Sequence, residues 1–286
     1  MTRRTRERTR VTILILLISA ITWMMLLVNP GSIMAFTHQH DSVTGSATMT
    51  HAHHSVAGLG GAPVSFQTLL EMNPIPSLAA GWALMLVAMM SPTLIAPIHH
   101  IRERTFKRRR ARSGTLFVVG YAAIWVAAGG VLIAVMLLLN LLAPQSYLPA
   151  VGVGLIALVW QCSPIKQRCL NRGHRHRELA AFGTAADLDA LRFGVTHGVW
   201  CVGSCWALML LPMVLLQGHV AAMAVVTFVV TSERLEQPRP LCWRLRFPGK
   251  LMRIVVAQTR IRLQHLPSGV GSPSLLTLLA KSLRWK

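Results

Sequence analysis

The basic residues of this chain all fall on one side of the membrane that its apolar runs predict. The chain contains the apolar runs Val11–Val28, Leu78–Ile98, Thr115–Leu142, Tyr147–Cys162, Gly194–Leu216 and Gly218–Ser232. All 29 lysines and arginines lie before the first run, after the last, between the second and third, or between the fourth and fifth. Runs of about 20 apolar residues cross a bilayer, and connections rich in Lys and Arg stay in the cytoplasm. The pattern predicts a multi-pass membrane protein with both ends in the cytoplasm.

The composition fits a membrane protein better than a soluble domain. Hydrophobic residues make up 53% of the chain and charged residues only 13%, about half the charged share of a typical soluble domain. In lipid each spanning segment must satisfy its own backbone hydrogen bonds, which a helix does. We therefore expect an all-α fold, a polytopic transmembrane helical bundle of five core spans plus an N-terminal signal anchor or signal peptide.

The net charge of +20 does not indicate a nucleic-acid partner. The basic runs Arg3–Arg6 and Lys107–Arg110 adjoin predicted spans and contain no aromatic residues on which bases could stack. The lipid bilayer itself, through its anionic headgroups, is the expected partner of this charge.

Four regions follow from the changes in composition. Residues 1–35 are a basic stretch and a signal anchor or signal peptide, with Ala35 as the cleavage point if it is cut. Residues 36–77 form a His-rich extracytoplasmic linker, residues 78–235 the membrane bundle, and residues 236–286 a basic cytoplasmic tail that is either a surface helix or disordered.

Two details of the bundle carry further expectations. Pro92 and Pro97 should bend the Leu78–Ile98 span and free backbone carbonyls, which a membrane helix tolerates only where protein covers them. The long connection Ser163–Phe193 contains Asp187 and Asp189, where a short surface helix is expected.

A stripe of potential metal ligands marks the fifth apolar run. His197, Cys201, Cys205 and Met209 recur every four residues, a spacing that places side chains along one face of a helix. Imidazole and thiolate bind zinc and copper, and thioether favours Cu(I). The alternative is packing, because Cys and Met are also ordinary buried residues. One helix cannot complete a tetrahedral shell, so other helices would have to close the site. Candidates to do so are Met85, Met89, His99, His100, Cys162 and Cys169.

The second group of candidate ligands lies in the extracytoplasmic linker. It consists of His38, His40, His51, His53 and His54. A His-rich tract can bind transition metals loosely even without a folded site, so we interpret it as a metal-scavenging segment; a solvated linker is the alternative.

Enzyme chemistry finds little support. The spans contain no acidic residue, and no Ser-His-Asp arrangement, phosphate loop or carboxylate pair is recognisable. A thiol-redox membrane enzyme using Cys201 and Cys205 is an alternative, although the spacing of four on one helix makes a disulfide strained.

Several blocks together resemble a known bacterial family. These are GWALMLVAMMSP, GYAAIW, WQCSPIKQRCL, HGVWCVGSCWALM and SERL. In this order they are similar to the predicted metal-binding integral membrane proteins of domain of unknown function 2182. The resemblance implies a helical bundle in the bacterial cytoplasmic membrane and a metal site. It places Cys169, His197, Cys201 and Cys205 at the family's recurrent Cys and His positions.

These observations predict an integral membrane protein that binds a soft transition metal for acquisition, delivery or homeostasis. Copper is the expected metal and zinc the second choice, because His and Met outside and Cys, His and Met inside form a graded set of copper-compatible donors. A membrane or exported protein that receives the metal is the expected partner. A non-catalytic scaffold, with the stripe as packing, is the remaining alternative.

Overall fold

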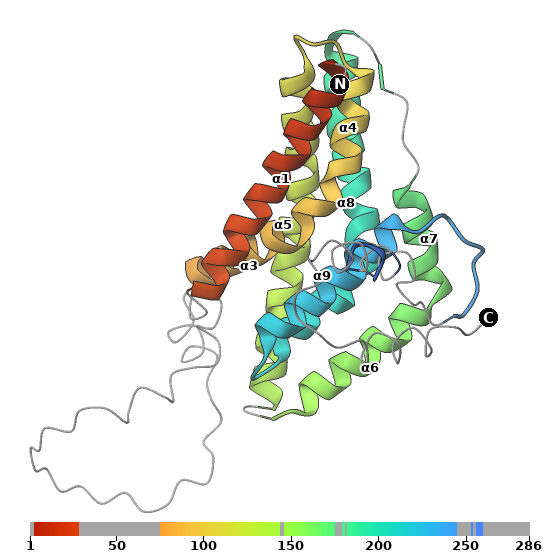
Figure 1. Ribbon diagram of the computed structural model, residues 1–286. Helices are drawn as coiled ribbons and strands as arrows, with labels where there is room; N and C mark the ends of the chain where they lie inside the picture. Colours follow the sequence, from red (N-terminus) through yellow and green to blue (C-terminus); the bar gives the residue numbers. More distant parts are fainter. Residues whose placement is uncertain are drawn as a thin grey trace, which may run out of the picture. The chain divides into compact units, whose positions relative to one another are not determined.

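The structure is a computed structural model, and it describes residues 3–28, 75–143, 146–174, 179–180, 182–244, 253 and 256–259. The chain divides into two compact units, Met1–Phe247 and Pro248–Lys286. In the second unit, the described residues 253 and 256–259 are helical. The described part of the first unit is built from helices (Figure 1), as the sequence predicts for the fold class. They are α1 (Arg3–Val28), α3 (Ile75–Met90), the 3₁₀ turn η3 (Ser91–Leu94), α4 (Ile95–Arg104), α5 (Arg110–Leu142), α6 (Leu148–Cys162), α7 (Pro164–Gly173), α8 (Gly183–Val214) and α9 (His219–Leu235).

Several of these helices are long and apolar enough to cross a bilayer. Thr5–Val28, Ile75–Arg104, Arg110–Leu142 and Gly183–Val214 meet this condition among the described residues, and α6 with α7 could add a fifth span bent by 65°. Their outward faces carry large apolar side chains, such as Val126, Leu138 and Leu155, which are more than half exposed. Such surfaces are compatible with a multi-pass membrane protein.

The second predicted span is broken at Pro92, as the sequence indicates. A proline at this position has no N–H with which to bond the carbonyl of Ala88 four residues earlier. The side chains of α1 take over that carbonyl: Ser19 Oγ donates to it at 2.7 Å and Trp23 Nε1 at 3.2 Å. Figure 1 shows α1 alongside this part of the chain, consistent with its hydrogen bonds to α3. The helix break thus fixes the position of α1.

The connection before the fifth run differs from the prediction. Asp187 and Asp189 do not lie in a separate short helix, because α8 begins at Gly183 and continues for 32 residues. Asp187 forms ion pairs with Arg109 at 2.8 Å and Arg112 at 2.7 Å. Both acidic residues belong to the extension of α8 beyond the predicted span. Asp187 binds arginines at the start of α5, and Asp189 accepts from the backbone N–H of Ala180 at 3.1 Å.

Among the described helices, α5 and α8 make the most extensive contact, and they pack through glycines. A Cβ atom on Gly120 would lie 2.6 Å from the backbone oxygen of Leu191, and one on Gly194 would overlap the backbone oxygen of Phe117. Small residues allow this approach between membrane helices. The α5–α8 contact brings the aromatic side chains of α5 against α8.

Removing both donors to the Ala88 carbonyl tests the docking of α1. We expect the double variant Ser19→Ala, Trp23→Phe to lower the free energy of unfolding by about 1–3 kcal/mol, because it leaves a buried carbonyl unsatisfied. Thermal unfolding in detergent measures this. The control is Thr22→Val, whose hydroxyl bonds within its own helix to Ile18 O; equal stability of double variant and wild type would contradict the account.

The glycine contact predicts a second stability effect. Gly194→Ala should destabilise the bundle by about 1–3 kcal/mol through overpacking, although alanine is the better helix former. Gly114→Ala on α5 is the matched control, since a Cβ there meets nothing within 4 Å, and it should be neutral or stabilising. A Gly194→Ala variant as stable as the Gly114→Ala variant would show that the helices can separate without cost.

Candidate metal centre

The stripe predicted from the sequence lies on one buried face of α8. Cys201 and Met209 are completely buried, Cys205 is 1% exposed and His197 is 7% exposed. The helix runs through all of these positions without a break, so their spacing of four stacks them as expected. The two thiols therefore lie on successive turns, away from water.

Helix α5 covers the stripe. The hydroxyl of Tyr121 lies 3.3 Å from Cys201 Sγ, and Cys205 Sγ donates to the carbonyl of Cys201 at 3.0 Å. The ring of His197 lies 5.9 Å from Phe117, 6.0 Å from Tyr121 and 6.0 Å from Phe193, measured between ring centroids. The thiols are thus accompanied by one phenol, and the imidazole is enclosed by aromatic rings.

Cys169 lies near α8 but on another face. Its Sγ would be 2.9 Å from a Cβ placed on Gly203. Gly203 is two positions from Cys201, a rotation of about 200° around the helix. The structure therefore does not bring Cys169 to the stripe. In the described part of the chain, His, Cys, Asp and Glu form no group of three or more that could hold a metal ion.

Six methionines share a buried cluster with the thiol pair. Cys201 and Cys205 belong to the same buried cluster as Met85, Met89, Met90, Met136, Met209 and Met223. The cluster also contains Trp82 and Trp125, whose rings are 6.0 Å apart. Thioether sulfur is a soft ligand for Cu(I) but also an adaptable packing group. The predicted Met85 and Met89 therefore belong to the same core as the pair.

Among the described residues, the predicted ligands His99, His100 and Cys162 have surroundings other than the thiol pair. His99 Nε2 lies 2.9 Å from Thr12 Oγ1 of α1, and the ring of His100 packs edge-on against Phe193 at 5.8 Å. Cys162 is half-buried at the end of α6. The histidines of the extracytoplasmic linker, His38, His40, His51, His53 and His54, lie outside the described residues.

A buried polar cluster joins α6, α7 and α9, and sequence reasoning missed it. Lys166 is completely buried and pairs with Glu233 at 2.8 Å. Gln161 donates to Glu233 and accepts from Lys166. The sequence offered one signal, since Glu233 is the acidic residue next to the last apolar run, but nothing in the pattern pairs it with Lys166.

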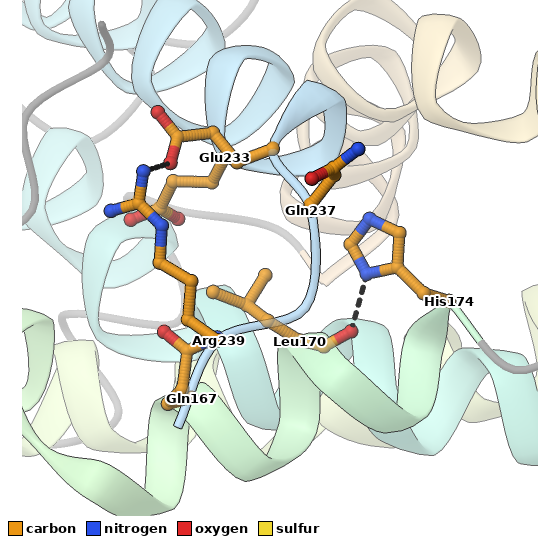
Figure 2. Close-up of a pocket in the computed structure, with 7 residues that line it drawn as sticks. Gln167, Leu170, His174, Glu233, Gln237 and Arg239 are labelled. Atoms are coloured by element: carbon orange, nitrogen blue, oxygen red, sulfur yellow. Dashed lines mark hydrogen bonds and ion pairs between the residues drawn. The ribbon is translucent and has the colours of Figure 1, made fainter. Parts of the chain in front are cut away.

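A small recess lies beside this cluster, lined by Gln167, Leu170, His174, Glu233, Glu236, Gln237 and Arg239. Figure 2 shows the ring of His174 turned to the carbonyl of Leu170, at 2.8 Å from Nδ1. Its Nε2 lies 3.1 Å from the carbonyl of Arg234, and Arg239 pairs with Glu236. Because these polar groups bind one another, we interpret the recess as part of the contact between α7 and the end of α9 rather than as a ligand site.

Comparison with known proteins identifies the family. The fold defines a helical protein with several helices long enough to span a membrane. Residues 79–250, more than half of the chain, match the family model PpoB2, described as a copper chaperone. The chain belongs to this copper chaperone family, which supports a copper-related function. The matched region includes α8 and leaves out the His-rich linker. No curated protein and no solved structure matches the chain.

Because the ion pair is buried, a single substitution should lower the free energy of unfolding much more than a double substitution that removes both charges. Glu233→Gln should cost about 3–5 kcal/mol of unfolding free energy, because it leaves Lys166 charged and buried without its partner. The double variant Lys166→Met, Glu233→Leu should recover most of this loss. Chemical unfolding in detergent measures both. Arg239→Gln, which removes an exposed pair, is the control and should change stability by less than about 1 kcal/mol; an equally small effect of Glu233→Gln would contradict the burial of the pair.

Proposed function

We propose that this protein is an integral membrane copper chaperone that holds Cu(I) between Cys201 and Cys205 and passes it to a receiving protein. The observation that carries the proposal is the pair of buried thiols on successive turns of α8, in a chain of the copper chaperone family. The metal is cargo rather than a resident cofactor.

The donor set favours Cu(I) over zinc. Structural zinc sites use four ligands in a tetrahedron, whereas the described part of the chain gathers no group of even three His, Cys, Asp or Glu side chains. Two thiolates with thioethers nearby suit a soft, monovalent ion that accepts few ligands. Met209, one turn beyond Cys205, and His197, one turn before Cys201, are the candidates for additional ligands on the same face.

Because the stripe is enclosed, we expect that another segment first binds the metal and then passes it to the stripe. We infer that the His-rich linker, with His38, His40, His51, His53 and His54, collects copper outside the cytoplasmic membrane. The proposed topology, with the N-terminal end and the tail in the cytoplasm beside anionic lipid headgroups, is supported by the distribution of the basic residues. Cys169 of α7, which packs against another face of α8, is proposed to be a ligand during transfer rather than part of the enclosed pair.

Metal binding by the full-length protein tests the function. Protein purified in detergent should bind one equivalent of Cu(I) in competition with a chromophoric Cu(I) chelator. The double variant Cys201→Ser, Cys205→Ser should lose at least about 100-fold in affinity, because hydroxyls replace the soft ligands.

Two variants serve as controls for this measurement. Cys242→Ser removes the exposed thiol of the chain and should leave the affinity unchanged. Deletion of residues 36–55 removes the histidine tract and should leave the high-affinity equivalent in place. Loss of the high-affinity equivalent on deletion, together with its survival in the double variant, would assign copper binding to the linker and leave the stripe as packing.

A further inference from the structure

An arginine lies beside the thiol pair at the end of α9. Arg234 Nη2 donates to Ser204 Oγ at 3.1 Å, and Ser204 Oγ donates in turn to the carbonyl of Cys201 at 2.8 Å. The Nη1 atom packs against Gly173 of α7, where a Cβ would approach it to 2.5 Å. The guanidinium is therefore held between α7 and the segment of α8 that carries Cys201 and Cys205.

No carboxylate in the described part of the chain forms an ion pair with this arginine. The neighbouring Glu233 is already paired with Lys166 at 2.8 Å, so these two charges cancel. The Nε atom of Arg234 is buried and has no hydrogen-bond partner among the described residues. The side chain as a whole is partly buried, and a cation with limited access to water is unfavourable unless an anion compensates it.

The proposed copper complex would supply that anion. Thiols bind metal as thiolates, so Cu(I) with two thiolates carries one negative charge. A divalent ion with the same two thiolates is neutral. The positive charge of Arg234 balances the negative charge of the Cu(I) complex. Beside the neutral complex of a divalent ion, the charge of Arg234 would stay uncompensated.

We propose that Arg234 is the counter-charge of the Cys201–Cys205 site and that it selects a monovalent over a divalent soft metal ion. This inference rests on the proposed function, because it assigns a role to the same thiol pair. Arg234 touches no metal in it, and acts as a positioning and specificity-determining residue through its charge. The competing role is mechanical, in which Arg234 only joins α7, α8 and α9.

The two roles differ in how a substitution affects ions of different charge. Silver(I) and mercury(II) both bind thiolate pairs, and neither needs a reductant to stay in its oxidation state. Affinities for Cu(I), Ag(I) and Hg(II) are measured by chelator competition on the full-length protein, in a Cys242→Ser background that removes the exposed thiol. The variants are Arg234→Gln, which removes the charge, and Arg234→Lys, which keeps it.

We expect Arg234→Gln to lower the affinity for Cu(I) and for Ag(I) by on the order of 10- to 100-fold, the size of a charge interaction in a partly buried site. Its affinity for Hg(II) should change by less than about 3-fold, and Arg234→Lys should restore most of the Ag(I) affinity. An equal loss for monovalent and divalent ions, or no loss for either, would overturn the proposal in favour of the mechanical role.

A second pair of variants keeps the test independent of whether Arg234→Gln folds. Ser204→Asp would place a carboxylate against Nη2 and cancel the charge while retaining the arginine, and Ser204→Asn is its uncharged match. Only Ser204→Asp should lower the ratio of Ag(I) to Hg(II) affinity; identical ratios in the two variants would also overturn the proposal. Failure of the proposed function looks different, because wild type would then bind none of these ions through Cys201 and Cys205.

Discussion

The close contact between α5 and α8 is the constraint on which the rest of the site depends. Gly194 and Gly120 remove the side chains that would hold the two backbones apart, and the resulting approach places Tyr121 at 3.3 Å from Cys201. Without this approach, α5 would not cover the thiols. The same packing surrounds His197 with aromatic rings. Helix packing, rather than any local motif, therefore creates the enclosed environment in which a soft metal ion would be held.

The sequence predicted the features that follow from local geometry. A spacing of four residues fixes a common helix face whatever the surroundings, so the stripe from His197 to Met209 lies as predicted. Apolar runs of sufficient length predicted the long helices. Pro92 predicted both a break and a free carbonyl, because the missing N–H is a property of the residue itself. The last apolar run, Gly218–Ser232, is the exception. It corresponds to α9, which has 17 residues and is not among the described helices that are long and apolar enough to cross a bilayer.

The features that depend on tertiary packing could not be read from the sequence. Cys169 is close to α8 along the chain and in space, yet the bend of 65° between α6 and α7 directs it to Gly203 rather than to Cys201. The pair of Lys166 and Glu233 joins residues far apart in the chain, and no spacing rule connects them. For the same reason the place of Arg234 beside Ser204 emerged only from the arrangement of α7, α8 and α9. Composition showed that charges were present without showing which of them are buried.

In the proposed copper complex, sulfur ligands inside the bundle, rather than histidines outside it, hold the metal. X-ray absorption at the copper K-edge, on full-length protein loaded with one equivalent of Cu(I), tests this most directly. We expect a first shell dominated by sulfur, with two thiolates and at most a small number of further ligands. A shell of nitrogen atoms alone, with the multiple-scattering pattern of imidazole, would contradict it.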